Sequence, residues 1–401
     1  MPPGISVEPV VTPRQRRAFL LFPWRIYGGD PNWVPPVLSE RAARLDPRKN
    51  PLFQHGEAEP FVAVRDGQVV GTIAAAVDHH ANQLRDAQIA IFGFFECVDD
   101  YAVAQALLGR AVAWACARGL TTLRGPQNFS ANDEPGLLIE GRETPPGLLM
   151  SWTPPYYVDF VERYGFRKWM DLLAYRIYRD ELPAGEGDDV LPARLVRVAE
   201  YASRRYGYTV RRADPGNWDG EMETARHIYN QSLGVLPEFT PMEEREWHQQ
   251  AERLRPLIDP DFALFAQVEG REVGFGLGLP DINQALLHCN GLRYPWNYFQ
   301  LWWHSRRLPG LSFKIMALLP EYWGRGLDAL IYLEMGRAAL RRGYQWVDMS
   351  LTSEDNPMTN KLATRLGARV DKRYRIYELG DPLSYRMRRG ATPPASNPQA
   401  W

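Results

Sequence analysis

The sequence predicts a mixed α/β (α+β) protein in which one mixed-sheet unit occurs twice in tandem. The length of 401 residues is enough for two or three domains, and strand-like and helix-like segments alternate along it. Similar segments also return in the same order further along the chain, which indicates an internal repeat. The separations are 203, 202 and 199 residues for Gly71 and Gly274, Gly165 and Gly367, and the two Tyr-Arg-Ile-Tyr tetrapeptides that begin at Tyr175 and Tyr374.

The first unit begins with a hairpin, because residues 61–75 have the pattern strand, Asp-Gly turn, strand. A strand over 88–95 precedes a helix over 103–118, which ends in a basic residue and a glycine, a common helix stop. The unit is completed by a strand over 121–125, a polar loop over 128–133, a short helix over 156–164 and a last strand around 175–178.

The second unit repeats this order with a hairpin over 265–277, a strand over 311–318, a helix over 328–342, a strand over 346–351, a loop over 352–356, a helix over 358–366 and a strand around 374–377. A polar linker over 180–189 and a helix over 192–206 join the two units. We therefore expect an N-terminal domain over 1–180, a linker and helix over 181–206, a C-terminal domain over 207–382 and a disordered tail over 383–401.

The composition is that of a soluble globular protein, with 45% hydrophobic and 24% charged residues. This excludes a disordered, collagenous or coiled-coil chain. The net charge of -1 gives no support to nucleic-acid binding. The three cysteines are too few for a disulfide framework or a zinc site and fit a reducing compartment. The N-terminus has no signal-peptide pattern and no segment reaches the length of a membrane helix. We expect a cytoplasmic protein without a bound metal or a membrane span. The sequence does not indicate an oligomeric state.

Residues 318–330, with the sequence Leu-Leu-Pro-Glu-Tyr-Trp-Gly-Arg-Gly-Leu-Asp-Ala-Leu, have the pattern of a strand end, a Gly-rich turn and a helix start. Such a turn offers free backbone N–H groups and the positive end of the helix dipole to a phosphate. Together with the repeated element order, this segment resembles the GNAT superfamily of N-acetyltransferases. The chain over 5–380 also resembles bacterial tandem GNAT-like proteins of unassigned substrate, through the segments 23–27, 30–36 and 125–133.

The resemblance implies that acetyl-CoA or another acyl-CoA is the donor, held where two parallel central strands splay apart. The residues that it implies for donor binding are Leu318, Leu319, Gly324, Arg325, Gly326, Leu327 and Asn356. Three positions depart from the family pattern: Trp323 and Asp328 flank the turn, and Ala363 stands where the family often has the Tyr that protonates the leaving thiolate. In the first half, three carboxylates over 96–100 replace the Gly-rich turn, so we expect the donor in the second half.

Two glutamates are candidates for the base that takes the proton of an acceptor amine. Glu354 follows a central parallel strand, where ligands gather in open α/β sheets; the alternative is a solvated loop. Glu96 ends an apolar strand, where burial would raise the pKa of its carboxyl. Its alternative is a structural ion pair with Arg110 or Arg118. For Asn356, the alternative to donor binding is the cap of the next helix.

Four further residues are candidates for substrate binding. Asn128, Asn132 and Asp133 occupy the first-half loop that corresponds to the loop of Glu354, and they could fix a hydroxyl or an amide, or only form turns. Trp303 belongs to an aromatic stripe at helical spacing over 295–306, which could line a binding wall but is more often core.

These observations favour an acyl-CoA-dependent N-acyltransferase that acts on a small-molecule or peptide amine, with acetyl as the expected acyl group. A non-catalytic GNAT-like protein that binds a ligand or partner is the alternative, favoured by the missing Tyr and by Asp328. An aminoacyl-tRNA donor is a third option, against which the neutral net charge speaks.

Overall fold

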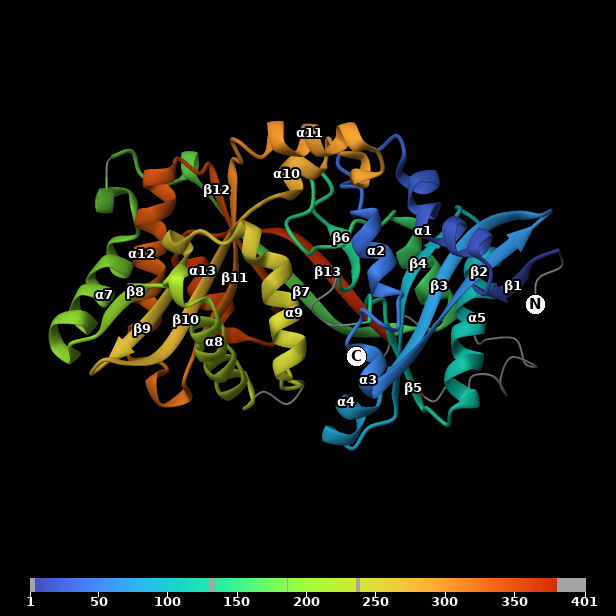
Figure 1. Ribbon diagram of the computed structural model, residues 1–401, viewed down its shortest axis with the longest axis horizontal. Coiled ribbons are helices and arrows are strands. Elements are labelled where there is room, and N and C mark those ends of the chain that lie inside the picture. The colour runs from blue at the N-terminus through green and yellow to red at the C-terminus, as the bar shows by residue number, and fades with distance from the viewer. Residues whose placement is uncertain (1–3, 130–133, 186, 236–238, 381–401) are drawn as a thin grey trace, which may run out of the picture.

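All thirteen strands belong to one long twisted sheet in the computed structural model, which describes residues 4–129, 134–185, 187–235 and 239–380 (Figure 1). The strand order is β1 (Ser6–Pro9), β2 (Gly56–Arg65), β3 (Gln68–Asp78), β4 (Ile89–Cys97), β5 (Thr122–Gly125), β13 (Arg369–Gly380), β7 (Arg167–Tyr178), β12 (Trp346–Ser353), β11 (Gly310–Leu318), β10 (Arg271–Pro280), β9 (Ala263–Val268) and β8 (Thr209–Arg212), with β6 (Leu137–Glu140) paired to β13. The predicted mixed α/β fold of two repeated units is confirmed, since β2-β3-β4-β5 and β9-β10-β11-β12 have the same order. In both units the third and fourth of these strands are parallel.

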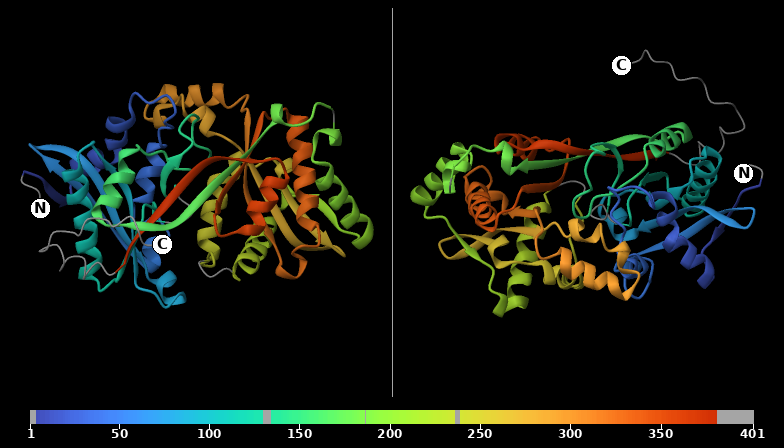
Figure 2. Two further views of the ribbon diagram at one scale, coloured as in Figure 1. Left: turned by 180° about the vertical axis from the view of Figure 1, so that it is seen from behind. Right: turned by 90° about the horizontal axis from the view of Figure 1, so that it is seen from above.

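Helices cover both faces of this sheet (Figures 1 and 2). In the first half they are α1 (Pro13–Tyr27), α2 (Leu38–Arg44), α3 (Leu52–His55), α4 (His79–Leu84), α5 (Tyr101–Ala117) and α6 (Tyr156–Tyr164). In the second half they are α7 (Ala193–Tyr206), α8 (Trp218–Leu233), α9 (Glu244–Leu254), α10 (Asn283–Leu286), α11 (Pro295–His304), α12 (Leu327–Arg342) and α13 (Pro357–Arg365).

The core is split into layers by the sheet, as the alternation of side chains requires. On β3, Ile73 and Ala75 pack with α5 and α6, whereas Ala74 and Ala76 pack with α1. In the second half, one core lies between the sheet and α7 and α12, and another between the sheet and α8. The central strands read as continuous apolar runs because both of their faces are buried.

Local predictions agree with the structure at the hairpins and at the linker. The residue before each turn glycine, Asp66 and Glu269, has a positive φ like the glycine itself, as a two-residue hairpin turn requires. The helix predicted over 192–206 is α7. The tail predicted to be disordered lies outside the described residues from 381 onward.

The last strand of each half is exchanged with the other half, which the repeat did not reveal. β13 pairs with β5 of the first half, and β7 pairs with β12 of the second half. The two exchanged strands also pair with each other along most of their length, at the centre of the sheet (Figure 2). Tyr377 and Leu379 of β13 therefore belong to the core of the first half, and Ile177 of β7 packs against the core of the second.

The repeated Tyr-Arg-Ile-Tyr tetrapeptide links the exchanged strands. Arg375 in β13 donates two hydrogen bonds to Asp171 in β7, at 2.7 and 3.0 Å. Arg176 in β7 pairs in turn with Asp371 in β13, with 3.4 Å between Nη1 and Oδ2. Each copy of the tetrapeptide thus supplies an arginine to a carboxylate of the other copy's strand.

The exchange predicts that the two halves unfold together. Tyr377→Ala should destabilise the chain by about 3–5 kcal/mol, because the ring is fully buried in the core of the first half. Denaturant titration should be monitored by hydrogen exchange in both halves. Both halves should unfold in a single transition, and the midpoint of that transition should shift equally in both halves of the variant. Val370→Ala on the same strand is the control, since Val370 is 41% exposed. Separate transitions for the two halves in the Tyr377 variant would contradict this expectation.

Candidate active site

The parallel strands β11 and β12 separate after a short paired stretch. Their pairing runs from Gly310 opposite Trp346 to Ser312 opposite Asp348 and ends there. In the next residues β11 carries a bulge, since Leu277 of β10 pairs with Ile315 while Gly278 pairs with Phe313. The splay that the GNAT resemblance implies is therefore present in the second half.

In the first half, the corresponding opening between β4 and β5 is bridged by the loop that follows β5. The backbone N–H of Gln127 donates to the carbonyl of Phe92 at 2.8 Å, and the N–H of Phe94 donates to Oδ1 of Asn128 at 2.8 Å. In the second half, the N–H of Glu354 turns instead to the carbonyl of Asp171 on β7, at 2.9 Å. The splay between β11 and β12 is the better candidate for a ligand.

The Gly-rich turn precedes α12, as predicted. Gly324 has a φ of +71° and open space where a side chain would begin, and Arg325 beside it is exposed. Gly326 also has a positive φ, but its absent side chain would meet Val198 and Ala202 of α7 at 3.1 Å. Gly326 is thus required by the packing of α7 on the start of α12, and Gly324 is the open position of the turn.

The other residues expected at the donor site lie around this turn. The N–H of Leu318 donates to Oγ of Ser232 at 3.0 Å, and that of Leu319 to the carbonyl of Val273 at 2.9 Å. Leu327 is fully buried in the first turn of α12. The side chain of Asn356 accepts from the N–H of Thr359 at 3.1 Å and so caps α13.

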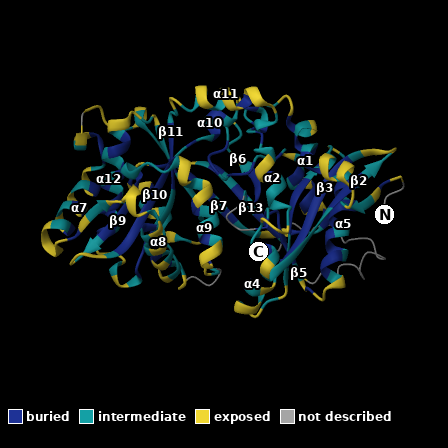
Figure 3. Ribbon diagram, in the orientation of Figure 1, coloured by how far each residue is buried: buried dark blue, intermediate teal, exposed yellow. Residues whose placement is uncertain are grey.

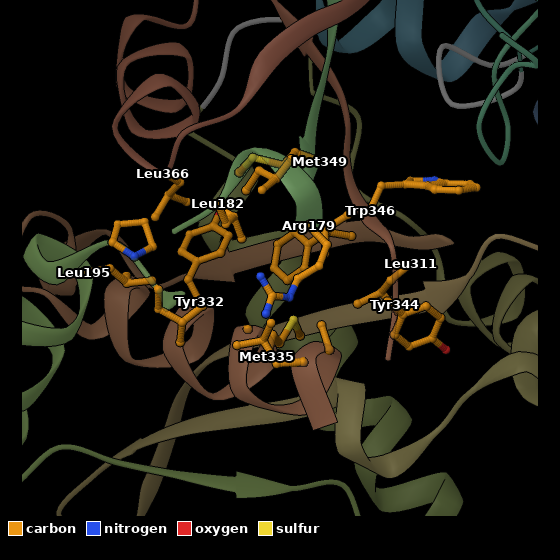
Figure 4. A pocket seen from close by; sticks show the side chains of 18 of the residues that line it. Arg179, Leu182, Leu195, Leu311, Tyr332, Met335, Tyr344, Trp346, Met349 and Leu366 are labelled. Atoms are coloured by element: carbon orange, nitrogen blue, oxygen red, sulfur yellow. The ribbon is translucent and has the colours of Figure 1, made fainter. Parts of the chain in front are cut away.

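A pocket with a largely apolar lining lies where α7, α12 and α13 cover β11 and β12 (Figure 4). Arg179 is the only charged residue among those that line it. Its apolar walls include Leu182, Leu191, Leu195, Leu311, Phe313, Tyr332, Met335, Met349 and Leu366. Since Leu311 and Phe313 face this pocket, Ser312 between them faces the other side of the sheet.

On that other side, charged and aromatic side chains from both halves gather where the exchanged strands meet. We call Arg142, Arg176, Asp348, Asp371 and Tyr374 the central polar cluster. Arg176 lies 3.8 Å from Oδ2 of Asp348 and 3.4 Å from Oδ2 of Asp371. Burial raises the pKa of Tyr374, whose hydroxyl also interacts with the charges of all four other members.

The central polar cluster holds buried polar atoms without hydrogen-bond partners in the described structure. They are Nε of Arg142, Nε and Nη2 of Arg176, Oδ2 of Asp348, Oδ2 of Asp371 and the hydroxyl of Tyr374. Buried polar groups are normally paired, so a concentration of unpaired ones calls for water, an ion or a ligand. Asp348 and Tyr374 have no exposed surface at all.

Further titratable groups border this cluster, among them Asp281 and Lys314. Burial, with the nearby charge of Asp348, raises the pKa of Asp281 to about 6. Burial also lowers the pKa of Lys314, although both carboxylates act against that change. Lys314 stands at the bulge of β11 and donates to the carbonyl of Leu148 at 2.5 Å. A carboxylate and an amine that titrate nearer to neutral pH are typical of acid–base sites.

A loop of the first half closes over these groups. The amide of Asn283 donates to the carbonyls of Pro146 and Gly147, at 3.1 and 2.9 Å. A side chain at Gly147 would begin 2.8 Å from Oδ2 of Asp348. A side chain at this position would displace the Asp348 carboxylate, and the site is built from both halves.

Glu354 lies at the end of β12, but both of its oxygens have partners on β7. Oε2 pairs with Nζ of Lys168 at 2.8 Å, and Oε1 accepts from the N–H of Asp171 at 3.0 Å. The carboxylate joins β12 to β7, and its predicted role as a base stays a prediction.

Glu96 lies among tyrosines in the first half. Its Oε2 accepts from the hydroxyls of Tyr27 and Tyr157, at 2.7 and 2.9 Å. Burial raises the pKa of Glu96 to about 7, against the effect of these hydrogen bonds. The alternative ion pair with Arg118 is absent from the described contacts, because Arg118 binds Glu57 through both oxygens at 2.9 Å.

The candidate substrate residues are not brought together. Asn128 donates to Oε2 of Glu134 at 2.8 Å and is used within its own loop. Asn132 and Asp133 lie outside the described residues. Trp303 is 57% exposed on α11, and the other aromatic residues of its stripe are exposed as well. The interpretation of that stripe as core is wrong.

Sequence reasoning missed the central polar cluster. Its signal was an aspartate, Asp348, between apolar neighbours in a strand expected to be buried. No further pattern marks its partners, which come from three other segments of the chain. Among the residues with described positions, no group of three or more His, Cys, Asp and Glu is arranged to hold a metal ion. No described helix is long and apolar enough to cross a membrane.

Glu96 makes stability depend on pH in a direction that can be tested. Because its folded pKa of about 7 is above the unfolded value, this group favours folding most below about pH 4.5, and the contribution is lost as pH rises through 7. The free energy of unfolding, measured with urea, should fall by roughly 1–3 kcal/mol as the pH rises between these values, and Glu96→Gln should abolish this fall.

Glu57→Gln is the matched control for this series. Arg118 lowers the pKa of Glu57, so the contribution of Glu57 to stability is lost as pH falls. The Glu57→Gln variant should therefore lose part of the decrease in stability at low pH and keep the decrease at high pH. If the stability of the Glu96→Gln variant depended on pH as that of the parent chain does, Glu96 would not titrate in this range.

Two bacterial proteins are similar to this chain over most of its length. It is 33% identical over 388 residues to a bacterial ceramide synthase of Caulobacter vibrioides, covering 93% of this chain and 97% of that protein. It is 32% identical over 373 residues to Protein YghO of Escherichia coli, covering 90% and 92%. No protein-family model matches the chain.

Solved structures share the fold at low identity. A tandem GNAT protein from the clavulanic acid biosynthesis pathway has a TM-score of 0.55 at 14% identity, covering 94% of this chain and 98% of that one. A GCN5-related N-acetyltransferase from Sphaerobacter thermophilus has a TM-score of 0.53 at 15% identity, covering 95% and 96%. The chain has the tandem GNAT-like fold and belongs to the family that includes the bacterial ceramide synthase and YghO.

Proposed function

We propose that the protein transfers a long acyl chain from acyl-CoA to the amine of a long-chain amino alcohol, forming a ceramide-type amide. The observation that carries this proposal is the central polar cluster, with its unpaired buried groups beside the splay of β11 and β12. The name of the relative that is 33% identical supports the substrate class. The acyl group is then long rather than the acetyl group expected from the sequence.

The two faces of the splay suit an amphiphilic substrate and product. The apolar pocket on the α12 side provides a hydrocarbon environment, which an acetyl group would not need. The polar face supplies carboxylates for an ammonium group and arginines and a tyrosine for hydroxyl groups. A site of this kind would reject an acceptor that leaves its buried charges unpaired.

The reaction needs a base for the acceptor and an acid for the donor. The amine nitrogen attacks the thioester carbonyl carbon, a C–N bond forms and the C–S bond breaks. Asp348, whose Oδ2 has no hydrogen bond and lies 3.8 Å from Arg176, or Asp281 would take the proton that the ammonium must lose. Tyr374 has an unpaired hydroxyl and could protonate the leaving thiolate, a role for which Ala363 offers no group.

The function is tested by a matrix of donors and acceptors. We expect amide formation from palmitoyl-CoA and a sphingoid base, and much slower reaction with acetyl-CoA or with a short water-soluble amine. Liquid chromatography with mass spectrometry detects the products. Equal rates with acetyl-CoA and small amines would overturn the proposed substrate class, and no turnover with any acyl-CoA would support the non-catalytic alternative.

Asp348→Asn is expected to lower kcat by about 10²–10⁴-fold, because the variant keeps the shape of the side chain but cannot accept the proton. Asp355→Asn, at an exposed position near the end of the same strand, is the control. Glu354→Gln should cost less, since both Glu354 oxygens are already bound to β7. Retained coenzyme A binding would confirm that the Asp348 variant is folded; full activity in it would remove Asp348 from the chemistry.

The turn at Gly324 is proposed to hold the donor's pyrophosphate, with Arg325 as the added cation. Gly324→Asp and Gly324→Asn differ only in charge, and both residue types tolerate a positive φ better than most. Calorimetry should show that Gly324→Asp weakens coenzyme A binding by about tenfold or more relative to Gly324→Asn. Equal affinities for the pair would move the pyrophosphate away from this turn.

A further inference from the structure

Helix α11 lies along one edge of the molecule and is largely exposed (Figure 3), and most of its exposed residues are aromatic. The exposed fractions are 60% for Trp296, 57% for Tyr298, 63% for Phe299, 51% for Trp302 and 57% for Trp303. We call these five residues the aromatic surface. Asn297 is the only residue of α11 that is buried. Large apolar side chains gathered at one place on a surface mark an interaction site.

The segment that carries α11 has no counterpart in the first half. Residues 281–309 connect β10 to β11, whereas the shorter segment 79–88 connects β3 to β4 at the equivalent position. The repeat thus folds without this insertion, and its presence in one half only is not explained by the architecture of the sheet.

The insertion is fixed to the first half through its inner side. The indole N–H of Trp24 donates to Oδ1 of Asn290 at 2.6 Å, and the guanidinium of Arg293 lies 5.0 Å from the centre of the Trp24 ring. A side chain at Gly291 would begin 2.5 Å from the carbonyl of Pro36, so the backbones are in close contact. Because the insertion belongs to the second half and packs on the first half with its inner side, the outer side of α11 faces away from both halves.

The charges that the insertion and its flanks carry after Asp281 are of one sign. Residues 282–320 contain no Asp or Glu, while Arg293, Arg306 and Arg307 flank α11. The guanidinium of Arg306 lies 3.6 Å from the centre of the Trp302 ring. Tryptophan, tyrosine and arginine together are the residues that occupy the boundary between lipid headgroups and acyl chains. The positive charge adds attraction to anionic headgroups.

We propose that α11 is an interfacial anchor that docks the protein on an anionic lipid bilayer, with the aromatic surface at the level of the headgroups. The positive charge selects a lipid surface over a second copy of the chain, because two copies of this face would bring arginines together. Asp281, which borders the central polar cluster, is the first residue of the same insertion. The proposal stands independently of the reaction above.

The test is flotation with vesicles of equal parts phosphatidylglycerol and phosphatidylcholine, without donor or acceptor present. The parent chain should float with these vesicles. Trp296→Ser combined with Trp302→Ser should weaken binding on the order of 100-fold, since each removed indole costs about tenfold. Arg306→Gln and Arg307→Gln should each weaken vesicle binding about fivefold. This loss should be absent with vesicles of phosphatidylcholine alone.

Tyr201→Ser combined with Tyr206→Ser on α7 is the matched control, because these tyrosines are 61% and 48% exposed on another surface. This pair should float like the parent chain, and unchanged unfolding midpoints would show that every variant is folded. Equal flotation of the tryptophan pair and the parent chain would overturn the proposal. So would a parent chain that does not float but forms a dimer that the tryptophan pair dissociates, because a second copy then covers α11.

Discussion

The exchange of β7 and β13 is the constraint on which the rest of the structure depends. Each half lacks its own last strand next to its fourth strand, and each obtains that strand from the other half. The hydrogen-bond ladder consequently runs without a break from β1 to β8. Neither half can complete its core alone, since Tyr377 closes one core and Ile177 packs on the other. The duplicated unit thus forms one continuous sheet.

The same exchange creates the candidate site. Arg176 arrives on β7, Asp371 and Tyr374 on β13 and Asp348 on β12, and the exchange places β7 between β13 and β12. Burying several charges costs free energy that their mutual attraction recovers only with good hydrogen-bond geometry. Here several atoms lack partners, so the cluster is poorly justified as a stabilising network and better explained as a place where a ligand completes the pairing.

The two halves have diverged around this centre. In the first, the loop after β5 bridges the splay, and Glu96 is enclosed with two tyrosines. In the second, the splay is separated from its loop, the Gly-rich turn is present, and the insertion over 281–309 adds α11. The first half contributes Gly147 and Leu148 to the site of the second. One half thus resembles a donor-binding unit and the other supplies a wall.

Local features of this protein were determined by the sequence itself, because they depend on neighbours in the chain. The Asp-Gly hairpin turn, the helix over 192–206 and the cap at Asn356 each follow from backbone preferences within a few residues. The repeat and the mixed α/β class follow from patterns of the same kind. The resemblance to the tandem GNAT-like proteins added the Gly-rich turn before α12.

Tertiary structure alone decided which copy of Tyr-Arg-Ile-Tyr pairs with which half. The two strands carry the same tetrapeptide, so either partner satisfies the same local pattern, and only the closure of both cores selects the exchange. The aromatic stripe of α11 has the same helical spacing whether it is core or surface, and the position of the insertion outside the sheet decided that it is exposed. Asp348 and Tyr374 are distant in sequence and meet only through strand order, which no short-range preference encodes.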